Sequence, residues 1–314
     1  MERACDVAII GGGPAGLSAA LILGRARRTV HVIDDGHQRN RPVRESHGFL
    51  GHDGLSPREL LQRARSQLDR YPTIACTPDH VNEIAGQIDA FNLRLQSGDT
   101  ILPRRVIFAT GMYDDLPPLE GLNRLWGKRV FVCPYCDAWE FRDRRMAVIG
   151  NVRSALELAQ ELWNWSHDLV ICPTSNAPVP HELRQWQLAA DVPKTASPPA
   201  KMNERDGMIA VECANGEVVD CAVVFVSAPL KQRSDLPARL GCDMTERCTI
   251  RVDANNRTTV PGCFAAGDCI TRYHQIVFAA SSGARAAIAI NEELYEADAR
   301  ALAETSAEKI PLTG

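Results

Sequence analysis

Two cysteines lie close together near the middle of the chain, in the stretch Cys133-Pro134-Tyr135-Cys136. One helical turn across this spacing brings the two sulfurs within disulfide range, and a helix N-terminus favours thiolate over thiol. A zinc site can use the same pair, but no second C-x-x-C and no H-x-x-x-H occurs to complete it. We therefore predict a disulfide that opens and closes, and no metal site. Asp137 follows directly, and its charge complements the helix terminus.

Composition narrows the class of protein. The 314 residues include 35 basic and 39 acidic side chains, so the net charge is -4, without a long run of one sign. This balance argues against a nucleic-acid partner. The length favours two domains, no apolar run reaches the roughly 18 to 20 residues of a membrane span, and the N-terminus lacks the pattern of a secretory signal. We expect a cytoplasmic protein in which most of the eleven cysteines are reduced.

The N-terminal segment has the pattern of a dinucleotide site. An apolar run, Val7 to Ile10, predicts a buried strand, and Gly11-Gly12-Gly13-Pro14-Ala15-Gly16 follows with glycines at positions one, three and six. The first glycine allows a tight turn, the second allows a pyrophosphate to approach, and the third allows a helix to pack closely on the strand. That helix is expected from Leu17 to about Arg27, with its first amides directed at the phosphates.

A second strand is expected from Thr29 to Ile33, ending in Asp34. Its carboxylate is placed to accept hydrogen bonds from a ribose, although strand-end acids also serve turns. The combination of strand, glycine turn, helix, second strand and acid predicts a dinucleotide-binding domain.

Two later stretches, Val106-Ile107-Phe108-Ala109-Thr110-Gly111 and Cys263-Phe264-Ala265-Ala266-Gly267-Asp268, each read as a buried strand that ends in small residues. Together with the glycine turn and the mid-chain cysteines, they resemble the low-molecular-weight thioredoxin reductase group of FAD flavoproteins. The resemblance implies an α/β fold of two dinucleotide-binding (Rossmann-like) domains, the second inserted in the first. The FAD domain would comprise 1–112 and 244–314, and 113–243 would form the domain that carries the cysteines.

The resemblance also implies site residues and a homodimer. Tightly bound FAD would contact Gly11, Gly13, Pro14, Ala15, Gly16, Asp34, Thr110, Gly111, Gly267, Asp268 and Gln275. Asp268 would bind the ribityl chain, and a last helix from about Tyr273 to Ala297 would direct its N-terminus at the flavin. His274 at that end is either a proton carrier or an ordinary packing residue. His47 and His52 fall in a loop that lies beneath the flavin in relatives.

For the cysteines, the resemblance places Cys136 against the flavin and leaves Cys133 to be attacked by a substrate thiolate. Asp137 would be the acid and base for the dithiol. The four tryptophans Trp139, Trp163, Trp165 and Trp186 either line an apolar substrate cleft or belong to the core.

In the relatives, the domain that corresponds to 113–243 also binds the nicotinamide cofactor. Here the sequence departs from the reductase pattern at three places. Val152 occupies the third position of the turn after Met146–Gly150, where we expect its branched side chain to obstruct a pyrophosphate. Cys172-Pro173-Thr174 replaces a basic segment that grips the 2′-phosphate of NADPH, and Pro229 stands where a flexible glycine loop is usual. Arg153 or nearby basic residues could still rescue a degenerate site. NADPH binding is therefore doubtful.

These features resemble the NADP-independent dithiol oxidases of natural-product (antibiotic) biosynthesis, of the gliotoxin, holomycin and romidepsin type. The implied reaction closes a disulfide in a small-molecule dithiol and passes the electrons through FAD to O2, giving H2O2. The alternative is an NADPH-dependent thioredoxin reductase, or a similar disulfide reductase, with a thioredoxin-like protein partner. A protein that only binds FAD is the remaining class, and the two cysteines and Asp137 argue against it.

Overall fold

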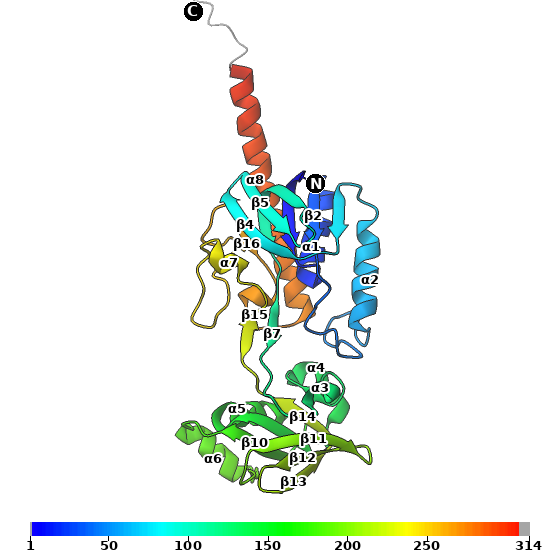
Figure 1. Cartoon of the computed structure of the whole chain (residues 1–314), viewed down its shortest axis with the longest axis vertical. Coiled ribbons are helices and arrows are strands. Elements are labelled where there is room, and N and C mark those ends of the chain that lie inside the picture. The colour runs from blue at the N-terminus through cyan, green and yellow to red at the C-terminus, as the bar shows by residue number, and fades with distance from the viewer. Residues whose placement is uncertain (1, 308–314) are drawn as a thin grey trace, which may run out of the picture. The chain divides into compact units, whose positions relative to one another are not determined.

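The computed structural model describes residues 2–307, which divide into two compact units (Figure 1). The first unit comprises 2–39, 58–113 and 231–307, and the second comprises 40–57 and 114–230. The inserted domain thus ends before the expected residue 243, because α7 (Leu236–Arg239) and Cys242 pack in the core of the first unit. The loop 40–57 joins the second unit, where Val43 packs against the core.

The first unit is built on a seven-stranded sheet with the order β3-β2-β1-β6-β5-β4, in which β16 also pairs with β6. Its parallel strands are β1 (Glu2–Ile10), β2 (Val30–Ile33), β3 (Ile74–Thr77), β6 (Thr100–Phe108) and β16 (Cys263–Ala265). β4 (Val81–Gln87) and β5 (Ala90–Leu95) form an antiparallel extension. The strands predicted around Val7–Ile10, Thr29–Ile33, Val106–Phe108 and Cys263–Ala265 are confirmed, and β1 starts earlier than expected.

Helices α1 (Pro14–Arg25) and α8 (Ile276–Ala307) pack against each other in this unit. Helix α2 (Pro57–Leu68) lies at the edge of the unit (Figure 1). A Cβ on Gly283 of α8 would overlap the carbonyl oxygen of Ala15, so a glycine is needed at this crossing. The last helix was expected to end near Ala297 but continues to Ala307, since no glycine or proline interrupts 284–307.

The second unit combines a parallel and an antiparallel sheet. The parallel sheet has the order β10-β9-β14-β8 and consists of β8 (Val130–Phe131), β9 (Met146–Asn151), β10 (Leu169–Ser175) and β14 (Val223–Val226). The antiparallel sheet consists of β11 (Pro199–Arg205), β12 (Met208–Cys213) and β13 (Val218–Cys221). The helical segments are α3 (Leu122–Leu125), α4 (Pro134–Asp137), η1 (Trp139–Phe141), α5 (Val152–Leu162) and α6 (His181–Ala189).

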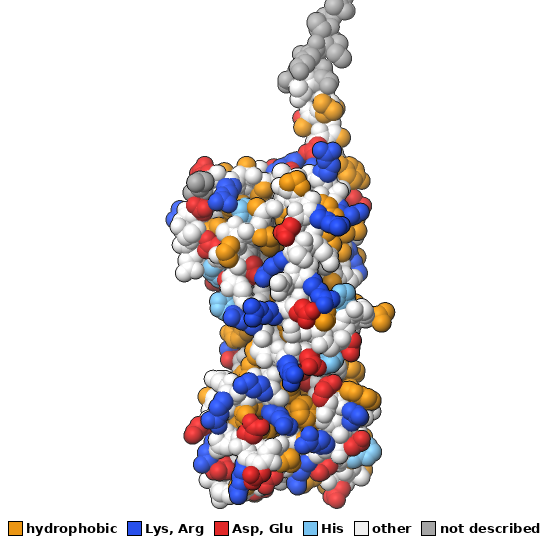
Figure 2. Space-filling view, turned by 90° about the vertical axis from the view of Figure 1, so that its right-hand side faces the viewer, with side chains coloured by type: hydrophobic (Ala, Val, Ile, Leu, Met, Phe, Trp, Pro, Cys, Tyr) orange, Lys and Arg blue, Asp and Glu red, His pale blue; other side chains and the backbone are white. Residues whose placement is uncertain are grey.

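Where the chain passes between the units, β7 (Met112–Asp114) pairs with β15 (Leu230–Gln232). The expected α/β class with two dinucleotide-type domains is confirmed. Among residues 2–307, no helix is long and apolar enough to cross a membrane. Basic and acidic side chains are interspersed over the face shown in Figure 2, in keeping with the small net charge.

Candidate functional site

The glycine turn after β1 leaves room for a phosphate. Gly11 has φ +111°, and a Cβ there would overlap the carbonyl oxygen of Ala109. A Cβ on Gly16 would overlap the carbonyl oxygen of Gly11, so α1 packs directly on the turn. Gly13 precedes α1 as its N-cap without a side-chain cap, and a Cβ there would meet nothing within 4 Å. The space beside Gly13, next to the N-terminus of α1 with Pro14 and Ala15, is therefore open, and no side chain caps this helix end.

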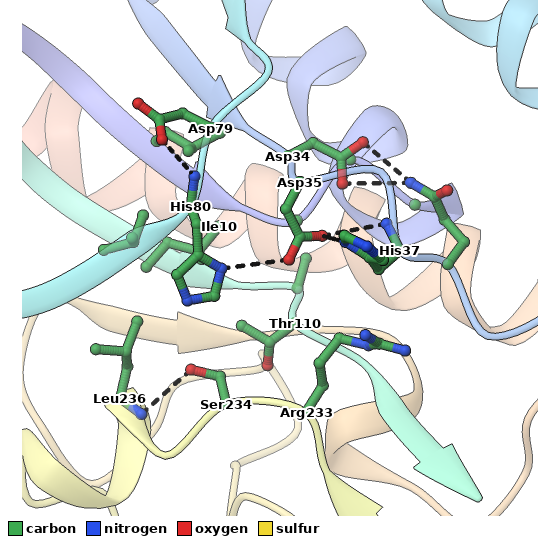
Figure 3. A pocket seen from close by; sticks show the side chains of 17 residues that line it. Ile10, Asp34, Asp35, His37, Asp79, His80, Thr110, Arg233, Ser234 and Leu236 are labelled. Carbon is green, nitrogen blue, oxygen red and sulfur yellow. Dashed lines mark hydrogen bonds and ion pairs between the residues drawn. The ribbon is translucent and has the colours of Figure 1, made fainter. Parts of the chain in front are cut away.

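A pocket extends from this turn past the ends of β2 and β6 (Figure 3). Asp34 lies in its wall, where its carboxylate accepts a hydrogen bond from Arg65 Nη2 at 2.6 Å and another from Gln38 Nε2 at 3.0 Å. Each carboxylate oxygen has two lone pairs, so acceptor capacity remains for a ribose hydroxyl. Thr110 lines the same pocket, and its Oγ1 is buried.

Asp35 forms a second polar group in the wall, between two histidines. His80 Nδ1 lies 3.2 Å and His37 Nδ1 3.3 Å from its carboxylate oxygens. Burial acts to raise the pKa of Asp35, but hydrogen bonds from the His37 amide and the His80 ring outweigh it, and the pKa is lowered. An open pyrophosphate cradle beside polar strand ends fits a dinucleotide such as FAD.

The other predicted cofactor residues follow β6 and β16, which are neighbours in the sheet. Gly111 and Gly267 both have positive φ, and the Gly267 amide donates to Ser282 Oγ of α8 at 2.8 Å. Asp268 begins the short helix η2 (Asp268–Ile270), and its Oδ2 lies 3.8 Å from Arg39 Nη1. The carbonyl of Gln275 accepts the Ala279 amide in the first turn of α8. The structure thus brings these residues together in the first unit.

His274 lies just before α8, and both of its ring nitrogens are engaged. Nε2 lies 2.8 Å from the carbonyl oxygen of Thr271, which can only accept, so Nε2 carries the hydrogen. Nδ1 then accepts from Arg39 Nη1 at 2.8 Å. This geometry holds the Arg39 guanidinium in place, and the proton-carrier role of His274 stays a prediction.

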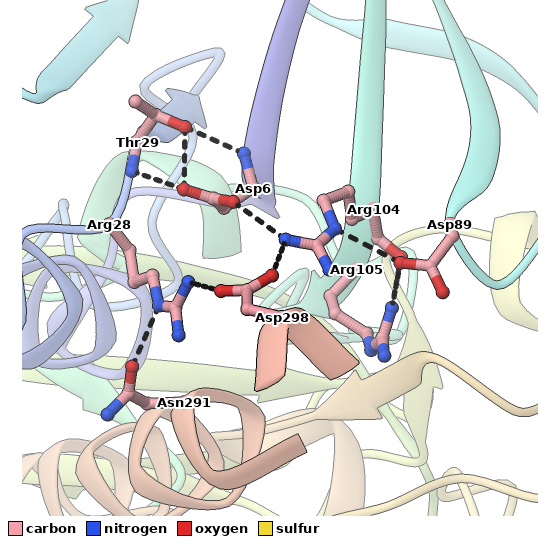
Figure 4. A network of polar contacts seen from close by, with 8 residues as sticks. All are labelled: Asp6, Arg28, Thr29, Asp89, Arg104, Arg105, Asn291 and Asp298. Carbon is pink, nitrogen blue, oxygen red and sulfur yellow. Dashed lines mark hydrogen bonds and ion pairs between the residues drawn. The ribbon is translucent and has the colours of Figure 1, made fainter. Parts of the chain in front are cut away.

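An ion network fixes the C-terminal half of α8 (Figure 4). Asp298 accepts from Arg28 Nη1 at 2.6 Å and from Arg104 Nη1 at 2.8 Å. Arg105 is 2% exposed and pairs with Asp89 at 2.8 Å and with Glu293 at 3.1 Å. A buried guanidinium is tolerated when carboxylates compensate its charge, so this network fixes the position of the helix.

In the second unit, Cys133 and Cys136 form a disulfide with a Cα–Cα distance of 5.3 Å. Cys133 is the N-cap of the single-turn helix α4, and its carbonyl accepts the amides of Cys136 and Asp137, each at 3.2 Å. The predicted proximity of the sulfurs is confirmed, while their redox activity stays a prediction.

Asp137 ends α4 in a partly buried position. Burial and, to a smaller degree, the charge of Glu140 together raise the pKa of this carboxyl to about 7, while His47 acts in the opposite direction. A group with this pKa can both give and take a proton near neutral pH. The sequence analysis missed Glu140, although its spacing of three from Asp137 is the available signal.

The turn between β9 and α5 is a poor phosphate site, but for a different physical reason than the one predicted. Val152 is 7% exposed and packs in the core as the first residue of α5, so the predicted obstruction by its side chain is wrong. Instead, β9 leads directly into α5, and Asn151 caps the helix by accepting the Ser154 amide at 3.0 Å. An amide that a phosphate could use is thus already paired.

The other two departures lie on β10 and directly before β15, where the Pro229 carbonyl accepts the Asp115 amide at 2.8 Å. Cys172 is buried on β10, and Pro173 continues the strand in register with Gly150. Arg153, which could have contacted a phosphate, pairs with Glu157 at 2.9 Å. Helix α5 thus offers a phosphate fewer partners than α1 does.

Residues 5–283 match the family model of the pyridine nucleotide-disulphide oxidoreductases. The chain belongs to this family. A probable thioredoxin reductase from Arthroderma benhamiae is 30% identical over 96% of this chain and 83% of its own length. The thioredoxin reductase tcpT from Claviceps purpurea is 33% identical over 84% and 86%. The crystal structure of HlmI superposes with a TM-score of 0.92, at 33% identity, over 98% of this chain and 97% of that one.

Membership of the family confirms the expected likeness to the thioredoxin reductases and makes the chain an oxidoreductase of an FAD-binding family. FAD, when bound, supplies two-electron redox chemistry. The residues that would hold it are the glycine turn, Asp34 and the turns after β6 and β16.

Proposed function

We propose that this protein is an FAD-dependent dithiol oxidase, which closes a disulfide in a small-molecule dithiol and delivers the electrons to O2 as H2O2. The contrast between two helix N-termini carries the proposal. α1 has no side-chain cap and borders an open cradle, whereas Asn151 caps α5. The first unit therefore suits one dinucleotide well, whereas the second unit offers a poorer site for another dinucleotide.

Electrons would then enter through the disulfide. A substrate thiolate attacks Cys133, the bond to Cys136 breaks, and the second substrate thiol displaces Cys133 to close the substrate disulfide. Asp137, with a pKa near 7, takes protons from the substrate thiols and returns them to the departing sulfurs. The substrate loses two electrons and two protons. The electrons would pass through the cofactor to O2, which also takes up two protons and becomes H2O2.

The surroundings of the disulfide suit an apolar substrate. The Tyr135 and Trp139 side chains, within and just after the C-x-x-C stretch, are 67% and 62% exposed. Trp163, Trp165 and Trp186 instead pack partly buried against the core of the second unit. Two exposed aromatic rings beside a reactive disulfide favour a small molecule with an apolar or aromatic body.

Two further proposals concern the state of the protein. Nine cysteines are free in the structure, which suits the reducing cytoplasm. Ile288, Tyr295 and Leu302 recur every seven residues along α8 with exposures of 52%, 52% and 70%, so they form one apolar stripe. We propose that a second copy of the chain covers this stripe in a homodimer, which light scattering at micromolar concentration tests.

The alternative is an NADPH-dependent thioredoxin reductase, and several relatives that carry this name favour it. The two functions differ in stoichiometry. The oxidase consumes one O2 and forms one H2O2 for each dithiol closed, without NADPH. Consumption of NADPH with reduction of a protein disulfide, and no O2 uptake with dithiols, would replace the proposed function by the alternative.

A further inference from the structure

A histidine lies among three carboxylates in the unit that carries the disulfide. His47 Nδ1 is 3.4 Å from Asp53 Oδ2, and its Nε2 is 3.7 Å from Glu140 Oε1 and 3.8 Å from Glu45 Oε2. The His47 side chain is 22% exposed. Each ring nitrogen thus faces a carboxylate. A neutral imidazole can donate to only one of them, whereas an imidazolium can donate on both sides.

The loop around His47 is closed by its own hydrogen bonds. The Ser46 amide donates to the Leu55 carbonyl at 2.8 Å, and the Gly54 amide donates back to Ser46 at 3.0 Å. Asp53 accepts the Gly48 amide at 2.8 Å with the carboxylate oxygen that does not face His47. The imidazole is therefore held by a fixed loop.

Glu140 lies three residues along the chain from Asp137, so the cluster around His47 includes a near sequence neighbour of that carboxyl. Only Ala138 separates α4 from η1: its amide donates to the Pro134 carbonyl, and its carbonyl accepts the Phe141 amide. Asp137 and Glu140 lie on these consecutive turns, and the charge of Glu140 raises the pKa of Asp137 while His47 lowers it. Arg44 on the same loop lies 3.7 Å from Glu45 at the surface.

We propose that His47 is a positioning residue for Asp137: it holds Glu140 and offsets its charge, and so sets the pH range in which Asp137 moves a proton. The inference rests on the proposed function. In the first exchange step, the proton of the substrate thiol passes to the Asp137 carboxylate as the sulfur attacks Cys133. The Cys133–Cys136 bond breaks with its electron pair on the departing sulfur, and the same proton then passes from Asp137 to that sulfur.

Two variants test the inference with opposite predicted signs. His47→Gln removes the imidazole that faces Glu140 and lowers the pKa of Asp137, so Asp137 should hold its proton to higher pH, and the acid limb of the exchange rate should move up by about half a unit to one unit. Glu140→Gln removes a negative charge and should move the limb down. The surface variant Arg44→Gln is the matched control on the same loop and should leave the profile unchanged.

The measurement is the rate at which dithiothreitol reduces the Cys133–Cys136 disulfide without oxygen between pH 5.5 and 9. Acid quench, alkylation and mass spectrometry read the thiols directly, independently of flavin turnover. Opposite shifts support the proposal. Uniformly lower rates in both variants without a shift, or profiles that coincide with the wild type, overturn it. If dithiothreitol does not reduce the wild-type disulfide at any pH while NADPH does, the proposed function itself fails, and the inference falls with it.

Discussion

Alanine at Gly13 should weaken cofactor binding without unfolding the apoprotein. A Cβ at Gly13 meets no protein atom within 4 Å, and the backbone there is extended with φ -79°. The loss of a favourable N-cap and the gain from a less flexible unfolded chain offset each other, so apoprotein stability should change by less than about 0.5 kcal/mol. The methyl group would stand where the pyrophosphate approaches, so the Kd for FAD should rise at least about tenfold, or about 1.4 kcal/mol.

Gly16→Ala is the matched control. Its Cβ would overlap the Gly11 carbonyl oxygen, so both stability and binding should suffer, with about 1–3 kcal/mol lost from the apoprotein. Urea unfolding of deflavinated protein gives the stability, and quenching of FAD fluorescence on titration gives the Kd. If Gly13→Ala binds FAD as tightly as the wild type, the cradle is not the pyrophosphate site. If Gly13→Ala unfolds the apoprotein, a Cβ at this position must clash with protein atoms, which contradicts the open space beside Gly13.

Three other variants test further parts of the account. Cys133→Ser should leave the Cys136 thiolate beside the oxidised flavin and produce a long-wavelength absorbance band, whereas Cys136→Ser should produce no such band. Both variants should lose turnover. A band in the Cys136→Ser variant alone would mean that the two cysteines have the opposite roles. Asp137→Asn should stabilise the fold above pH 7 and have little effect below pH 4, because the raised pKa means that the wild type loses stability as pH rises from about 4 to about 7; in chemical unfolding, the effect of the substitution should be larger at pH 8 than at pH 5 by at most about 3 kcal/mol, and an equal effect at both pH values would contradict the raised pKa of this carboxyl. Asp298→Asn removes a carboxylate whose pKa is lowered by hydrogen bonding to Arg28, so it should cost about 1 kcal/mol or less at pH 7, after allowance for solvent screening, and nothing near pH 2; a loss that persists there would refute the ionic origin.

Local signals in the sequence predicted much of the first unit. The glycine spacing at Gly11, Gly13 and Gly16 depends on close backbone contacts, which only one kind of turn makes, and the structure contains that turn. The Cys133–Cys136 spacing similarly constrains the sulfurs within one helical turn.

Features that depend on side-chain direction or on distant contacts were not predictable in this way. The spacing from Gly150 placed Val152 at the third position of a phosphate-binding turn. However, α5 begins at Val152, and the side chain packs in the core. Nothing near His47 in the sequence indicates that its loop joins the second unit and meets Glu140, because that contact links segments far apart in the chain.

Anaerobic flavin reduction tests the central claim most directly. The purified protein, with its FAD and without oxygen, is mixed first with micromolar NADPH and then with a small dithiol, while the flavin absorbance is followed. The account predicts that NADPH leaves the yellow colour unchanged, that the dithiol bleaches it, and that readmitted air restores it with formation of H2O2 and a cyclic disulfide. Rapid stoichiometric bleaching by NADPH, coupled to reduction of thioredoxin, would contradict the account and establish a thioredoxin reductase.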